Sequence, residues 1–471
     1  MVQPPESSQE RELRELIEIS RRRLHLLRVR VALEGINARP ENQIEIEDIE
    51  RRVFELENQM RQLAEGGRAP EDAAAKSRYK IDRPLTNLES AFQYQTLNLR
   101  FSPRTQQHPD SKPVYEVLLQ SDIGDVVGEF SAPFSSDDLL RFRLDVTGSI
   151  NTGAGIQPFR GIRPIFERLK GFGHRLYDSL PSVVKERFQA ARDSVPGARL
   201  RLTFRDAWLA SIPWEFLYDP NHGEFLGLSL RSVVVRYAEV GYPPLVGFAP
   251  PLRILVATPA PRDLPPLQVD QERKRIQDAL ADLKEAGLVE IQWLDFQESK
   301  RPVSLESLHD GLFNFRPHVL HFIGHGGLDE QQEGVLFFEQ RETWRAEAIK
   351  GVRLAQLITS SDNLRLVFLN ACQGATGSDV EKLGGVAAAL ANKGVAATLA
   401  MQFPVTDQAA IEFSGKFYQR VAEGAPIDVA VQEGRRHLGV VKDNPVEWAA
   451  PVLYLTPRDG RVFRQVQGAE A

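Results

Sequence analysis

Two stretches carry the strongest fold signal: HVLHFIGHGG at residues 318–327 and LVFLNACQG at residues 366–374. Each is a short apolar run that ends in glycine and polar residues, which is typical of a buried strand leaving a parallel sheet. Similar runs alternate with amphipathic segments between residues 250 and 455. This rhythm predicts an α/β fold with a mostly parallel sheet flanked by helices. The expected strands are 253–257, 289–294, 318–323, 364–369, 395–400 and 451–455, and the expected helices are 270–286, 305–314, 383–392, 407–422 and 427–438.

The segment before residue 250 predicts a second α/β unit. Alternating apolar residues indicate strands, and residues 162–192 are interpreted as one helix. The sequence IPWEFLY at 212–218 precedes a turn, and its Trp214 is expected in the core. His174 and His222 show no ligand spacing and are expected at the surface. The strands expected here are 97–101, 114–120, 200–204 and 232–237.

The N-terminal region predicts a helical hairpin. Residues 46–63 place apolar side chains at spacings of 3 and 4, a similar pattern precedes it, and GINARPENQ at 35–43 separates the two. Such a hairpin could self-associate, bind a protein partner or pack on its own body. The expected domains are therefore the hairpin at 1–66, a linker at 67–84, an intermediate α/β domain at 85–245 and a C-terminal domain at 250–471.

Composition narrows the class of protein. The 471 residues are 42% hydrophobic and 26% charged with a net charge of -6, so neither nucleic acid nor a membrane is an expected partner. The single cysteine, Cys372, excludes an intrachain disulfide or a multi-cysteine metal site within the chain. We expect a cytoplasmic protein that needs neither a metal nor another cofactor.

His325 and Cys372 are the candidate catalytic pair. Each follows one of the two opening strands, and adjacent parallel strands would bring the imidazole and the thiol to one edge of the sheet. An imidazole can take the thiol proton and so produce a nucleophilic thiolate. The backbone amides of Gly326 and Cys372 could then hold an oxyanion. The alternative for a lone cysteine after an apolar strand is an inert buried residue.

The pairing of HFIGHG at 321–326 with LNACQG at 369–374 resembles the CHAT domain, a caspase-like cysteine peptidase family related to separase. The resemblance covers roughly residues 250–455. It implies His325 as the base, Cys372 as the nucleophile, and Gly326 and Cys372 as oxyanion donors. CHAT family members often carry a segment like IPWEFLYDP in a degenerate caspase-like unit. Residues 85–242 resemble that unit loosely. We interpret His321, in the same motif, as structural.

The resulting expectation is a bacterial cysteine endopeptidase that cleaves protein or peptide substrates and is regulated by its upstream domains. Asp407 aligns with an acidic residue that resembles part of the substrate-binding region in related peptidases, which implies a basic substrate side chain. The alternative is that Thr406 or Asp407 caps the helix that begins there. The alternative function is a catalytically silent, caspase-fold signalling scaffold that acts through the N-terminal hairpin.

Overall fold

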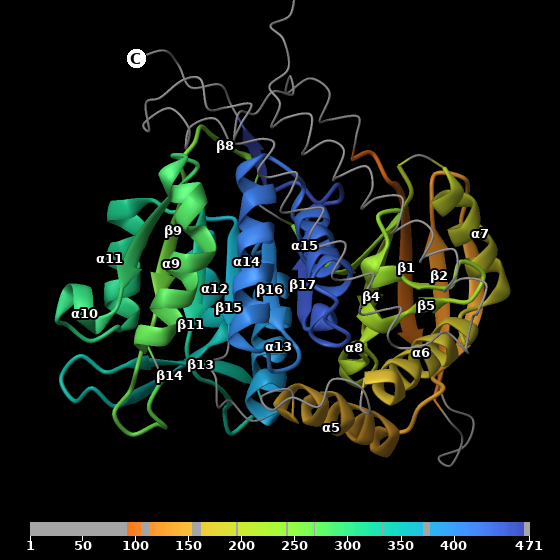
Figure 1. Ribbon diagram of the computed structural model, residues 1–471, viewed down its shortest axis with the longest axis horizontal. Coiled ribbons are helices and arrows are strands. Elements are labelled where there is room, and N and C mark those ends of the chain that lie inside the picture. The colour runs from red at the N-terminus through yellow and green to blue at the C-terminus, as the bar shows by residue number, and fades with distance from the viewer. Residues whose placement is uncertain are drawn as a thin grey trace, which may run out of the picture. The chain divides into compact units, whose positions relative to one another are not determined.

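The computed structural model describes residues 92–104, 113–152, 162–194, 196–241, 244–267, 269–331, 333–370 and 377–465. The chain divides into two units, Met1–Lys80 and Ile81–Ala471, and every described residue belongs to the second. The hairpin predicted at 1–66 and the linker predicted at 67–84 lie outside the described residues. Figure 1 shows the second unit as a central sheet with helices on its faces.

Eleven strands of the described residues form one sheet, in the order β10-β9-β11-β15-β16-β17-β7-β4-β1-β2-β3. All six strands predicted after residue 250 are present, with bounds within two residues of those expected. The central strands β11, β15 and β16 are buried along their whole length, as strands covered on both faces require, whereas the edge strand β10 exposes Glu290 and Gln292. These six are β9 (Leu252–Ala257), β10 (Val289–Leu294), β11 (Val319–Ile323), β15 (Leu366–Asn370), β16 (Ala397–Met401) and β17 (Pro451–Leu455). The upstream strands are β1 (Gln95–Pro103), β2 (Val114–Gln120), β3 (Val126–Ser131), β4 (Ala198–Phe204) and β7 (Ser232–Tyr237).

Strand β17 joins the two halves of the sheet. It runs antiparallel to β16, with Ala397 opposite Leu455, and parallel to β7, with Tyr454 opposite Arg236. The segments 85–245 and 250–471 therefore contribute strands to the same sheet. The domain boundaries proposed from the sequence stay a prediction.

Helices cover both faces of the C-terminal half of the sheet (Figure 1). On one face, Phe368 of β15 contacts Phe413, Phe417 and Tyr418 of α14, and α14 in turn packs against α9 and α15. On the other face, leucine and valine side chains of α11, α12 and α13 form one core with β11 and β15. Burying each such side chain contributes roughly 1.5–3 kcal/mol. These helices are α9 (Val269–Glu285), α11 (Leu305–Phe315), α12 (Gly351–Thr359), α13 (Gly377–Asn392), α14 (Asp407–Ala422) and α15 (Ile427–Arg436).

In the upstream half, one predicted helix is divided into two. Residues 162–192, expected as one helix, form α6 (Ile162–Asp178) and α7 (Ser182–Asp193). The break falls at Pro181, because proline lacks an N–H and disfavours helical geometry in the residue before it. The elements that were not predicted include α5 (Ser136–Thr152), α8 (Ala207–Ser211), β3 and the short strands β5 (Tyr218–Asp219), β6 (Glu224–Phe225) and β8 (Val246–Phe248). Trp214, in the 3₁₀ helix η3 (Trp214–Phe216), is fully buried as expected, and its Nε1 donates to the Leu209 carbonyl at 3.0 Å.

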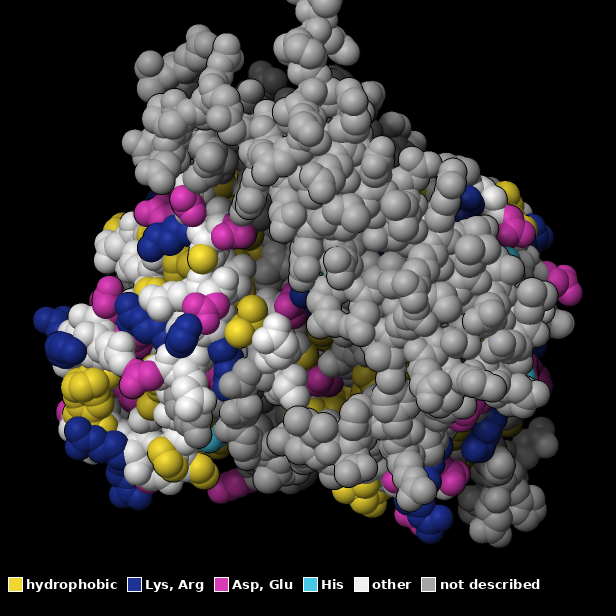
Figure 2. All heavy atoms as spheres, viewed as in Figure 1, with side chains coloured by type: hydrophobic (Ala, Val, Ile, Leu, Met, Phe, Trp, Pro, Cys, Tyr) yellow, Lys and Arg dark blue, Asp and Glu magenta, His cyan; other side chains and the backbone are white. Residues whose placement is uncertain are grey.

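A second, three-stranded sheet follows β11 and was not predicted. It consists of β12 (Gly326–Leu328), β13 (Gly334–Glu339) and β14 (Ala346–Lys350), paired antiparallel in that order. Acidic and basic side chains are intermixed over α9, α10 (Phe296–Ser299) and α11 in Figure 2. The surface seen there therefore has no large patch of a single charge sign. Within the part of the chain that the structure describes, no helix has the length and apolar character to cross a bilayer.

Candidate active site

The strands that lead to His325 and Cys372 lie next to each other, as predicted. Strands β11 and β15 pair in parallel, and Ile323 at the end of one is opposite Asn370 at the end of the other. Gly324 N, one residue further, donates to the Asn370 carbonyl at 3.3 Å. In the sequence, His325 follows Ile323 by two positions and Cys372 follows Asn370 by two positions. Cys372 itself lies outside the described residues.

His325 is held by a backbone carbonyl. Its side chain is half-buried, and Nε2 lies 2.9 Å from the carbonyl oxygen of Pro265. A carbonyl only accepts hydrogen bonds, so Nε2 carries the hydrogen and the lone pair of the neutral ring is on Nδ1. The contact with Pro265 could not be predicted, because a backbone oxygen has no residue-type signature. The structure thus assigns Nδ1 as the nitrogen of His325 that can take a proton.

The loop that carries Pro265, residues 258–267 after β9, is attached to the small sheet. Asp263 accepts hydrogen bonds from Ala346 N at 2.7 Å and from Arg345 Nε at 3.2 Å. The hydrogen bond from Ala346 is the largest cause of a lowered pKa of Asp263. The buried Glu339 accepts from Ala260 N at 2.8 Å, near the start of the loop. These side chains therefore fix the backbone oxygen that orients His325, and sequence reasoning missed both.

Gly326 begins β12, the edge strand of the small sheet. Phe337 N donates to the His325 carbonyl at 3.0 Å, which makes His325 and Phe337 a hydrogen-bonded pair of the antiparallel ladder. The next pair, Gly326 and Leu336, is then of the non-hydrogen-bonded type. In such a pair the N–H points away from the partner strand. The Gly326 amide is consequently directed off the edge of the small sheet, where β13 does not use it.

His321 lies in the core, as its interpretation as a structural residue requires. It is fully buried, and its ring stacks on Phe368 with the centroids 4.4 Å apart. The Tyr418 hydroxyl and its Nδ1 form a hydrogen bond of 2.9 Å. Burial lowers the pKa of His321 to about 3 and raises that of Tyr418 well above its ordinary value. The imidazole of His321 is consequently neutral inside the fold at neutral pH.

The N-cap of α14 is Thr406, which resolves the choice between Thr406 and Asp407 for that position. The Thr406 side chain accepts a hydrogen bond from Ala409 N at 3.3 Å, and its hydroxyl contacts Glu447 at 3.2 Å. Asp407 is the first residue of the helix, and its side chain is outside the described atoms. Its predicted role in substrate binding stays a prediction.

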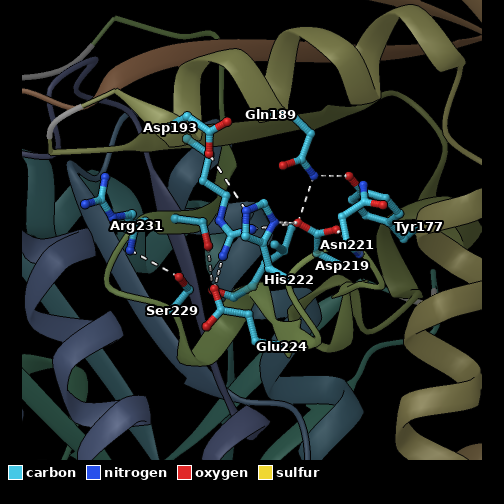
Figure 3. A network of polar contacts seen from close by, with 12 residues as sticks. Tyr177, Gln189, Asp193, Asp219, Asn221, His222, Glu224, Ser229 and Arg231 are labelled. Carbon is cyan, nitrogen blue, oxygen red and sulfur yellow. Dashed lines mark hydrogen bonds and ion pairs between the residues drawn. The ribbon is translucent and has the colours of Figure 1, made fainter.

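A polar cluster centred on Asp219 was not anticipated from the sequence (Figure 3). Asp219 is fully buried and accepts from Arg192 at 2.7 Å, from Gln189 at 2.8 Å and from the backbone N of Asn221 at 2.9 Å. His222, expected at the surface and 40% exposed, contributes Nδ1 at 2.8 Å. Four donors use the lone pairs of the carboxylate, so the cluster ties the turn after β5 (Tyr218–Asp219) to α7. This arrangement is structural.

The described residues contain no group of three or more His, Cys, Asp or Glu side chains arranged to hold a metal ion. A mostly parallel α/β sheet flanked by helices, with a histidine following one of two neighbouring central strands, is consistent with a caspase-like fold. A family model, the CHAT domain, matches residues 170–456, and the chain belongs to this caspase-like, protease-related family. The match begins well before residue 250 and so includes the IPWEFLYDP segment. In a comparison with curated proteins, no sequence matches the chain.

Proposed function

We propose that this protein is a cysteine endopeptidase with Cys372 as its nucleophile and His325 as its general base. The observation that carries the proposal is the parallel pairing of Ile323 with Asn370, from which His325 and Cys372 are each two residues away along the chain. With strands about 4.8 Å apart, residues at equal offsets from paired positions are within reach of each other. The caspase-like relationship of the CHAT family supports the same reaction.

In the proposed reaction, Nδ1 of His325 takes the thiol proton and the Cys372 thiolate attacks the scissile carbonyl carbon. The amides of Gly326 and Cys372 hold the resulting oxyanion. His325 then gives its proton to the leaving amine, and the peptide C–N bond breaks to leave an acyl-enzyme. A water, deprotonated by His325, releases the acyl group and restores the thiol. The hydrogen bond from Nε2 to Pro265 keeps the ring oriented and stabilises the imidazolium in these steps.

The finer assignments belong to the same proposal. Asp407 would favour a basic side chain next to the cleaved bond, because a carboxylate pairs with a guanidinium or an ammonium. The upstream domains, and the hairpin predicted at 1–66 in particular, would regulate the enzyme by binding a partner or a second copy. A reducing compartment such as the cytoplasm would keep Cys372 as a thiol.

The test is a peptide-library cleavage assay on the full chain, with Cys372→Ala and His325→Ala as variants and His309→Ala as control. His309 is an exposed histidine of α11, with 62% of its side chain accessible. We expect the control to cleave like the wild type and each variant to lose activity by about 100-fold or more. Unchanged cleavage by Cys372→Ala would overturn the proposal.

Thiol labelling gives a second readout that does not depend on finding a substrate. Cys372 is the only cysteine, so the rate of alkylation by iodoacetamide as a function of pH reports its pKa without ambiguity. A thiol paired with an imidazole should label with a pKa below the free value of about 8.5, and His325→Ala should raise it. An ordinary thiol pKa that His325→Ala leaves unchanged would instead support the silent scaffold.

A further inference from the structure

A cavity of about 1220 Å³ lies on the sheet where β1, β4 and the segment after β17 come together. None of its lining residues belongs to β11, β15 or the Pro265 loop, so it is separate from the proposed catalytic site. Its lining is rich in guanidinium groups, which come from strands far apart in the sequence. The arginines are Arg100, Arg199, Arg201, Arg458, Arg461 and Arg464.

The strand register explains why this face of the sheet is polar. Strands β1 and β4 pair in parallel, with Thr96 opposite Arg199 and Asn98 opposite Arg201. Side chains alternate between the two faces of a strand, so these four point to the same side. The leucines between them, such as Leu97 and Leu200, point to the opposite side and are buried in the core. A sheet face that elsewhere meets apolar helices is here lined by arginine and amide groups.

Two of the arginines are buried with hydrogen-bond donors that no acceptor satisfies. Arg199 and Arg201 are 3% and 4% exposed. Arg199 Nε donates to Asp428, but its Nη2 has no partner within the described structure. Arg201 lies 3.5 Å from the centroid of the Tyr237 ring, and its Nη1 reaches only the Arg458 carbonyl at 3.4 Å. Arg201 Nε also lacks an acceptor there.

Buried, charged donors of this kind are unfavourable unless an anion meets them. Arg100 is paired with Glu239, and Arg199 with Asp428. Burial is the main cause of a lowered pKa of Arg201, and the nearby charges of Arg458 and Arg199 lower it further. The acidic lining residues are Asp122 and Asp125 at the β2–β3 turn, Glu239, which pairs with Arg100, and Asp459, which follows Arg458 in the sequence. Among the described residues no carboxylate pairs with Arg201, so a bound anion at this end of the cavity would satisfy its guanidinium donors.

We propose that this cavity binds a phosphate-bearing small molecule, with the phosphate groups at Arg199, Arg201 and Arg458. Guanidinium groups stay charged at any physiological pH and bind phosphate through two parallel N–H donors. The volume exceeds that of a phosphate ion and is ample for a nucleotide. Phe92 and Tyr94 line the same cavity, the Tyr94 ring beneath the Arg199 guanidinium, and would give a base aromatic neighbours.

Isothermal titration calorimetry on the full chain tests the proposal, with ATP, inorganic pyrophosphate and adenosine as probes at constant ionic strength. We expect ATP and pyrophosphate to bind and adenosine, which lacks phosphate, not to bind. Arg458→Glu and Arg464→Glu change exposed side chains, so the fold should stay intact while ATP binding weakens about tenfold or more. Arg301→Glu, an exposed arginine outside the cavity, is the control and should bind as the wild type does.

Three outcomes would overturn the proposal. One is the absence of binding by ATP and pyrophosphate at millimolar concentration to folded wild-type protein. Another is equal ATP affinity in Arg458→Glu and the wild type, and the third is adenosine binding as tightly as ATP. Equal affinities for pyrophosphate and ATP would support the phosphate contacts and assign the adenosine no part in recognition. Because no step of the assay involves Cys372, its result is independent of whether the protein is a peptidase.

Discussion

Lowering the pH from 7 to 5 should destabilise the fold through His321. This residue is fully buried, and burial lowers its pKa to about 3. In the unfolded chain the same imidazole has a pKa of about 6.5. Between these two values the unfolded state binds a proton that the folded state does not, so stability falls as the pH falls. The loss begins near the unfolded pKa of about 6.5 and is complete near the folded pKa of about 3.

The size of the effect follows from the two pKa values. At pH 5 the imidazole is almost wholly neutral in the folded protein, but its protonation in the unfolded chain favours unfolding about 30-fold. This factor corresponds to a loss of about 2 kcal/mol in the free energy of unfolding. At pH 7 the corresponding loss is only about 0.2 kcal/mol. His318 is also buried and has its pKa lowered to about 4, so it adds a loss of similar size.

The variant His321→Phe isolates the contribution of one residue. A phenyl ring can keep the stack on Phe368, but it leaves the Tyr418 hydroxyl without its hydrogen-bond partner, which costs about 1–3 kcal/mol at pH 7. It also removes the titration. Urea denaturation should therefore show a stability gap to the wild type that shrinks by about 2 kcal/mol between pH 7 and pH 5.

Tyr418→Phe is the matched control, because it removes the same hydrogen bond and keeps the imidazole. Its gap to the wild type should change far less with pH. Effects of all other titrating groups are common to the proteins and cancel in the comparison. If the gap between wild type and His321→Phe is the same at both pH values, the buried, neutral state assigned to His321 is wrong.

Three further predictions concern other parts of the molecule. Asp263→Ala should lower the kcat of the proposed peptidase about tenfold in the peptide assay, because it frees the loop that orients His325. Arg345→Ala keeps the hydrogen bond from Ala346 N to Asp263 and should retain most of the activity. Asp219→Ala should destabilise the fold by about 1–3 kcal/mol in urea denaturation, because the donors of Gln189 and Arg192 lose their buried acceptor while Arg192 keeps its ion pair with Glu224. Gly173→Ala should lower the melting temperature, because its Cβ would lie 1.9 Å from a backbone oxygen of η3. Gly171→Ala is the control in the same helix: its Cβ meets nothing within 4 Å, so the melting temperature should not fall.

The central strands of the C-terminal half could be predicted because they are buried on both faces. Uninterrupted apolar runs such as 318–323 and 364–369 have the length of a strand and end in glycine or polar residues. That these two strands lie next to each other could also be predicted, because consecutive strands of an α/β sheet usually lie close together. The direction of β17 did not follow, because an apolar run has no polarity of its own. Its antiparallel pairing with β16 is set by the connection through α14 and α15.

Other features were missed for local reasons. Strand β12 has three residues, two of them glycine, and is too short to produce an alternating pattern. We predicted one helix over 162–192 despite Pro181, because the amphipathic spacing continues on both sides of this proline. In the site, the histidine was predictable from its place after a strand. The Pro265 carbonyl and the carboxylates that hold its loop were not, because their role depends on backbone contacts between segments far apart in the sequence.

The reversal of strand direction at β17 separates the two proposed sites. Because Ala397 at the start of β16 is opposite Leu455 at the end of β17, the residues after β17, including Arg458, leave the sheet at the edge where β16 begins. His325 follows β11 at the other edge, since β11 and β15 run parallel to β16. A ligand at Arg458 therefore cannot touch a peptide bound at His325. Any change in cleavage rate that ATP produces must then be transmitted through the sheet, and it would vanish in Arg458→Glu if the cavity is its source.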